Sequence, residues 1–164
     1  MIGNIGEVGL SPLPCLRLTM NAIQSIPDTT ATKLSFDTVS FAGNGWTAPV
    51  APVTDITLPF SGIVLVTAYD MDWGDASSGA GIRQLFTRAN DGVGSTRVAV
   101  GGPPSLAATA LKTIQSFSRV MKFVAGDTMQ IYAKQTSGGA LSVAMDDVFL
   151  QYLQLGTFTF SGTN

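Results

Sequence analysis

The residues most able to bind a metal ion are three aspartates that lie close together in the sequence, Asp70, Asp72 and Asp75. Carboxylate oxygens are the ligands that Ca²⁺ prefers, so the cluster is a candidate calcium site. Its spacing does not match the EF-hand calcium loop, because Gly74 stands at the fifth position and no glutamate closes the loop. We therefore expect a solvated strand end in preference to a metal site, and no cofactor beyond this calcium candidate.

A second candidate site consists of residues that could contact a ligand or receptor. Trp46 follows the turn residues Gly43-Asn44-Gly45, Trp73 ends a long apolar run, and Asp91 stands in the turn Asn90-Asp91-Gly92. Exposed aromatic rings stack on sugars or anchor in protein pockets, and loops on a rigid scaffold carry many binding residues. The alternative is that both tryptophans close the ends of the core.

The sequence offers little for catalysis. It contains no histidine, which removes the commonest general base and the commonest transition-metal ligand. Asp146 and Asp147 are neighbours, and adjacent side chains of a strand point apart, so the pair is not a natural acid–base couple. Cys15 has no histidine to activate it and is expected to be a packing residue. We predict that the protein is not an enzyme.

The candidate residues are positioned by a strand predicted over 62–73, which is rich in β-branched and aromatic residues and is bounded by Gly62 and Gly74. Strict alternation places two apolar sets on opposite faces of this strand. One set is Ile63, Leu65, Tyr69, Met71 and Trp73, and the other is Val64, Val66 and Ala68. A strand that is apolar on both faces requires cover on both sides.

Nine further strands are predicted around this one, with turn residues between them. The alanine-rich stretch 106–111 is expected to be a loop. The pattern predicts an all-β fold, an antiparallel ten-stranded jelly-roll sandwich. The expected strands are 16–20, 32–41, 55–58, 62–73, 82–88, 96–100, 114–124, 128–136, 141–145 and 148–155.

Composition points to contacts with other protein chains. Of the 164 residues, 45% are hydrophobic and only 12% are charged, which is about half the usual charged share. So few charged residues suggest that much of the protein's surface is buried in contacts with other chains. The net charge of −2 gives no basic field for nucleic acid, and no apolar run is long enough to span a membrane.

The chain is expected to divide into an N-terminal arm (1–14), a jelly-roll domain (15–156) and a C-terminal tail (157–164). The arm contains several glycines and prolines and few large side chains, without a period that would suggest collagen or a coiled coil. It is either a frayed terminus or an arm that becomes ordered on a partner. In the second case its apolar residues would attach the protein to a particle: Ile2, Ile5, Val8 and Leu10.

A series of short segments carries a family resemblance: 24–27, 34–38, 56–66, 117–120, 125–127 and 148–153. In this order they resemble the trimeric jelly roll of the complement-q and tumour necrosis factor superfamily, and above all its bacteriophage members. No single segment is diagnostic, and the order and spacing carry the resemblance, over roughly residues 15–156. Ile63-Val64 departs from the aromatic residues that often follow the glycine in this family.

The resemblance implies a homotrimer whose apolar faces meet around an axis. Tyr69, Tyr132, Phe149 and Tyr152 are candidates for that interface, and ordinary sandwich core is the alternative for each. It also implies a structural protein of a bacteriophage virion. We expect a capsid fibre, decoration or spike component attached through the arm to capsid or tail proteins, and in contact with a host surface glycan or protein. The alternatives are a receptor-binding tail fibre tip and a free lectin-like trimer.

Overall fold

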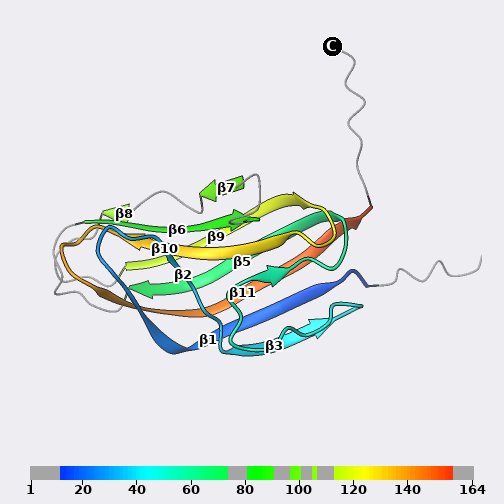
Figure 1. Cartoon of the computed structure of the whole chain (residues 1–164), viewed down its shortest axis with the longest axis horizontal. Coiled ribbons are helices and arrows are strands. Elements are labelled where there is room, and N and C mark those ends of the chain that lie inside the picture. Colours follow the sequence, from blue (N-terminus) through cyan, green and yellow to red (C-terminus); the bar gives the residue numbers. More distant parts are fainter. Residues whose placement is uncertain (1–11, 74–80, 91–96, 101–104, 107–112, 157–164) are drawn as a thin grey trace, which may run out of the picture.

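Two antiparallel sheets pack face to face in the computed structural model (Figure 1), which describes residues 12–73, 81–90, 97–100, 105–106 and 113–156. We call the five-stranded sheet sheet A. Its strand order is β3 (Thr38–Gly43), β1 (Cys15–Ile26), β11 (Leu141–Leu155), β5 (Gly62–Trp73) and β9 (Thr113–Phe123).

The six-stranded sheet, sheet B, covers the other side of the core. Its main order is β2 (Thr32–Lys33), β10 (Thr128–Gln135), β6 (Ile82–Ala89) and β7 (Arg97–Val100), and β4 (Ile56–Thr57) pairs with β10 while β8 (Ser105–Leu106) pairs with β6. The predicted all-β, antiparallel class is confirmed. The described residues hold no helix that is long and apolar enough to cross a membrane.

The strands differ from the expected ones in four places. The strand expected over 16–20 is longer, since β1 continues to Ile26. The single strand expected over 32–41 divides into β2 and β3, which belong to different sheets. The two strands expected at the C-terminal end form one continuous strand, β11. Residues 105–106 form the short strand β8, where the stretch from 106 was expected to be a loop. The described residues therefore contain eleven strand segments instead of ten.

A β-bulge in β5 corrects the predicted division of its faces. Tyr69 and Asp70 lie together opposite Ser116 of β9, and Asp70 has a φ of 46°. The extra residue reverses the alternation beyond it. The core face of β5 therefore carries Val64, Val66, Ala68, Met71 and Trp73, and the opposite face carries Ile63, Leu65 and Tyr69.

A second bulge lies at the same level in the neighbouring strands. Asp146 and Asp147 of β11 together face Thr19 of β1, between the pairs Leu18–Val148 and Met20–Met145. This bulge lets β11 bury residues on both sides of it while it turns Asp147 away from the core. Met145 and Val148 on either side of the pair are both buried, so the simple alternation expected for the two aspartates is broken by the bulge.

Pro14, which precedes β1, and Gly156, which follows β11, lie at one end of the sandwich. The carbonyl of Pro14 accepts a hydrogen bond from the Tyr152 amide, and the Gly156 amide donates to the Ser61 carbonyl. The turn at 137–139 lies at the other end, because it immediately precedes Leu141, which pairs with Ile26 (Figure 1). The long strands β1 and β11 therefore run the length of the domain between these ends.

Candidate functional site

One face of sheet A points away from the core and carries exposed apolar side chains. We call it the outer A face. Leu16 and Leu18 are fully buried, so Arg17 between them lies on the outer A face, and its partners in register there are Phe41 and Phe149. The large apolar side chains that are 45% to 60% exposed on this face are Phe41 of β3, Tyr69 of β5, Val120 of β9 and Leu153 of β11. Exposed apolar patches of this kind mark contact surfaces.

A small polar centre interrupts this apolar face. Arg17 Nε donates to Asp147 Oδ1 at 2.8 Å, and Arg17 Nη2 donates to Asp147 Oδ2. Thr19 Oγ1 donates to Asp147 Oδ1 at 3.0 Å and is also hydrogen-bonded to Ser40 Oγ. This bidentate geometry is the strongest arrangement that an arginine and a carboxylate adopt.

The ion pair lines an open pocket of about 410 Å³ together with Tyr69 and Phe149. The Asp147 side chain is 15% exposed and the Arg17 side chain 53% exposed. The hydrogen bond from Arg17 above all, followed by the hydrogen bond from Thr19 and the charge of Arg17, holds the pKa of Asp147 below that of an ordinary aspartate, against the opposing effect of burial. Asp147 also raises the pKa of Arg17. Both groups are therefore charged at neutral pH.

The four aromatic residues proposed for a trimer interface separate into three environments. Tyr69 and Phe149 lie together on the outer A face. Tyr132 belongs to sheet B, where it is 6% exposed, stacks on Phe86 at 5.6 Å between ring centroids and lies under the Arg88 guanidinium. Tyr152 is fully buried, so the core alternative holds for it.

The two tryptophans are core residues. Trp46 is 7% exposed and its ring lies 5.6 Å from that of Tyr152, while Trp73 is 1% exposed and its indole N–H donates to Gln115 Oε1 at 2.9 Å. The interpretation of these residues as exposed ligand contacts is therefore wrong, and they close the core as the alternative stated. Their flanking glycines and prolines gave a loop signal that did not reveal this burial. Asp91 lies outside the described residues.

The aspartates proposed for calcium are not assembled into a metal site in the part of the chain that the structure describes. Asp70 is exposed, and Ser116 Oγ accepts from its amide and donates to its carboxylate. Asp72 is half-buried, and Asp75 lies outside the described residues. Among the residues described, no group of three or more potential metal-ligating side chains is present.

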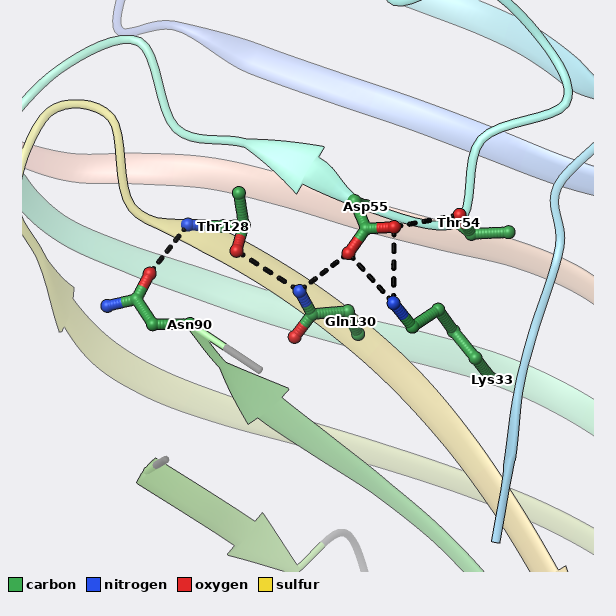
Figure 2. A network of polar contacts seen from close by, with 6 residues as sticks. All are labelled: Lys33, Thr54, Asp55, Asn90, Thr128 and Gln130. Atoms are coloured by element: carbon green, nitrogen blue, oxygen red, sulfur yellow. Dashed lines mark hydrogen bonds and ion pairs between the residues drawn. The ribbon is translucent and has the colours of Figure 1, made fainter. Parts of the chain in front are cut away.

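A polar network occupies the outer surface of sheet B (Figure 2). Asp55 accepts hydrogen bonds from Lys33 Nζ at 2.9 Å, from Gln130 Nε2 at 2.8 Å and from Thr54 Oγ1 at 2.9 Å. Burial raises the pKa of Asp55, but these hydrogen bonds and the charge of Lys33 together lower it. The network joins β2, β10 and the chain before β4, so its role is to fasten short strands to the sheet.

Sequence reasoning did not single out Arg17 as a site residue. The available signal was a charge between two leucines in the alternating segment Leu16-Arg17-Leu18. That pattern places Arg17 on the face away from the core, but it contains no information about Asp147, which is distant in the chain. The arm residues Ile2, Ile5, Val8 and Leu10 lie outside the described residues, so their role stays a prediction.

Comparison with solved structures shows where this architecture recurs. The globular domain of the zebrafish complement 1qA protein is 11% identical, with a TM-score of 0.59 over 87% of this chain and 99% of that chain. The Eiger TNF of S. frugiperda is 11% identical, with a TM-score of 0.61 over 93% and 99%. The fold is a complement-q/tumour necrosis factor-like jelly roll.

This jelly roll also occurs in a protein of a different kind. The PRD1 vertex protein P5 is 16% identical, with a TM-score of 0.50 over 87% of this chain and 99% of that chain. At such identities the likeness concerns the fold alone. No family model and no curated protein sequence matches the chain.

Proposed function

We propose that this protein is a non-enzymatic structural component of a bacteriophage virion, a homotrimer that attaches to the particle through residues 1–14. Within that function we favour a capsid fibre or decoration, because a protein with this fold is named as a vertex protein, the PRD1 vertex protein P5. A spike component that contacts the host surface uses the same assembly and attachment.

The outer A face is the observation that carries the homotrimer. A single chain leaves Phe41, Tyr69, Val120 and Leu153 about half exposed on one surface, and only 12% of the residues are charged. A stable obligate interface buries on the order of 2,000 Å² in total. A closed ring of identical copies covers such a face on every member and leaves no open end.

The particle location rests on other grounds. The sequence resembles phage members of the superfamily, and one protein with this fold is named as a vertex protein, the PRD1 vertex protein P5. Pro14 and Gly156 lie at the same end of the domain, so an arm that precedes residue 15 can hold that end on a surface while the opposite end projects away from it.

The free lectin-like trimer loses its main support. That hypothesis needed exposed aromatic rings, whereas Trp46 and Trp73 are both buried. We retain a receptor-binding tail tip as the alternative within the virion. A reconstruction of purified particles distinguishes the two, because density at the capsid supports a decoration and density at the tail supports a tip.

Sedimentation equilibrium tests the homotrimer and its face. We expect the protein to sediment as three chains, and Leu153→Glu together with Val120→Glu to produce folded single chains, because carboxylates on a covered apolar face are costly. Ile82→Glu is the matched control, since Ile82 is 42% exposed on β6 of the other sheet. A folded wild-type chain that sediments alone in dilute solution contradicts the proposal.

Binding to particles tests the arm. A protein lacking residues 1–11 keeps Pro14, whose carbonyl pairs with Tyr152, and we expect it to remain a folded trimer. It should no longer bind particles that lack the native protein. Particle binding that survives this deletion excludes the arm as the attachment element and leaves the homotrimer proposal unaffected.

A further inference from the structure

The outer A face combines apolar exposure with a charged pair at its centre, and this combination has a consequence for assembly. On the single chain, water reaches Arg17, which is 53% exposed, whereas Asp147 is only 15% exposed. A second copy laid over Tyr69 and Phe149 covers the same pocket, because these rings and the ion pair line it together. The pair is then removed from water as a unit.

We propose that Arg17 and Asp147 make the self-association of this chain sensitive to acid, so that protonation of Asp147 releases the copies from one another. The proposal rests on the homotrimer proposed above and assigns a regulatory element within its interface. An ion pair that is covered intact is tolerated, but a covered charge whose partner has been neutralised is strongly destabilising.

The direction of the pH effect follows from the environment in which Arg17 is left when Asp147 becomes neutral. In the single chain, a protonated Asp147 leaves the guanidinium partly solvated. In the assembly the same proton leaves a cation enclosed against apolar side chains. Asp147 must therefore bind its proton less readily in the assembly than in the single chain. Association is fully present above the pKa of Asp147 in the free chain, and is lost as the pH falls through the lower pKa of the assembled state.

The groups that surround Asp147 support assigning the acid effect mainly to the protonation of this one residue. Among the described residues, the ionisable side chains that face it are Arg17 of β1 and Tyr69 of β5. From β3 the nearest group is the hydroxyl of Ser40, through Thr19. Asp146 and Asp70 are exposed at the adjacent bulge positions, and Ser116 of β9 donates to the Asp70 carboxylate.

Sedimentation velocity from neutral to acid pH tests the proposal with two variants. The wild-type protein should be associated at neutral pH and should dissociate in acid into chains that keep the near-ultraviolet circular dichroism of the buried Trp46 and Trp73. Asp147→Asn should dissociate at neutral pH. Its association constant should fall about tenfold per copy for each unit by which the pKa of Asp147 differs between the free chain and the assembly. The double variant Arg17→Met with Asp147→Leu, which removes both charges, should stay associated in acid.

Each contrary result has a distinct meaning. If the wild-type protein and the double variant dissociate at the same pH, or if Asp147→Asn associates as strongly as the wild type, the ion pair is not the acid-sensitive element and the homotrimer stands without it. If the wild-type protein is already a single folded chain at neutral pH, the homotrimer itself is wrong, and the acid-sensitive interface is wrong with it.

Discussion

The phenol of Tyr152 hydrogen-bonds both backbone groups of one residue, Phe60. Its oxygen accepts from the Phe60 amide at 3.2 Å and its hydroxyl donates to the Phe60 carbonyl at 2.7 Å. The Phe60 ring also lies edge-on to the Tyr152 ring at 5.9 Å. A side chain of β11 thus fixes the segment that leads into β5, at the end of the domain where Pro14 and Gly156 lie.

Tyr152→Phe should therefore lower the free energy of unfolding by about 1–3 kcal/mol, because it leaves two backbone polar groups without their partner. Urea unfolding followed by tryptophan fluorescence measures the change. Tyr69→Phe is the control, since its phenol is about half exposed, and its effect should stay within about 0.5 kcal/mol. Equal effects of the two substitutions contradict a structural role for the Tyr152 hydroxyl.

Gly62→Ala should be more damaging than its small size suggests. A Cβ at this position would lie 2.2 Å from the carbonyl oxygen of Gln154 and 3.1 Å from Cδ1 of Tyr152. Because the first contact is with backbone, β5 and β11 must separate, and we expect a loss of roughly 2 kcal/mol or more in the free energy of unfolding. Gly139→Ala, whose added Cβ would meet no described atom within 4 Å, should be close to neutral in the same assay.

Much of this fold was predictable from sequence because turn residues and β-rich runs are local signals. The bounds of β5, Gly62 to Trp73, agree with the predicted 62–73. The faces of the strand beyond Asp70 were not predictable, since its left-handed φ and the bulge depend on Ser116 in a neighbouring strand. A single inserted residue reverses every later side chain, which is why Trp73 is buried on the face opposite to the expected one.

The candidate site was predictable only in part, for a related reason. Tyr69 and Phe149 were recognised as interface candidates, and they do lie together. The Arg17–Asp147 pair joins residues 130 positions apart, and nothing in either local sequence specifies the other. Tyr132 and Tyr152 have the same residue type and similar apolar surroundings in sequence, so only the sheet order distinguishes their environments.

Asp37 should make the free energy of unfolding depend on pH in acid. Its carboxylate accepts hydrogen bonds from the amides of Asn21 and Ala22, which lie at an irregularity in β1. The Asn21 amide above all, with Ala22 and Thr38, lowers the pKa of Asp37 despite some desolvation. The stabilisation is present above the pKa of an unfolded aspartate and is lost as the pH falls through the lower folded value.

Urea midpoints measured across the acid range test this expectation. Asp37→Asn should be less stable than the wild type at neutral pH and should show a shallower decline as the pH falls, since an amide cannot titrate. Asp28→Asn is a control in a turn at the other end of β1, where the carboxylate accepts a hydrogen bond from the Gly138 amide. An unchanged acid dependence in Asp37→Asn excludes this carboxylate as a source of it.

The network of Figure 2 predicts unequal effects of substituting two of its members, Gln130 and Lys33. Gln130 is fully buried and donates to Asp55 and to Thr128, so Gln130→Leu should cost about 1–3 kcal/mol by leaving acceptors unpaired. Lys33→Met removes a partly exposed ion pair and should cost about 0–1 kcal/mol. Urea unfolding of both variants measures the difference, and a larger loss for Lys33→Met would contradict the order.

The position of the turn at 137–139 gives the domain a use in engineering. Gly138 has a φ of 88°, and a Cβ added there would meet no described atom within 4 Å. This turn lies at the opposite end from Pro14 and Gly156. A foreign peptide spliced into it would be carried away from the end that we propose for attachment. In the proposed homotrimer, three such epitopes would be presented side by side, and the domain would then serve as a scaffold for multivalent display.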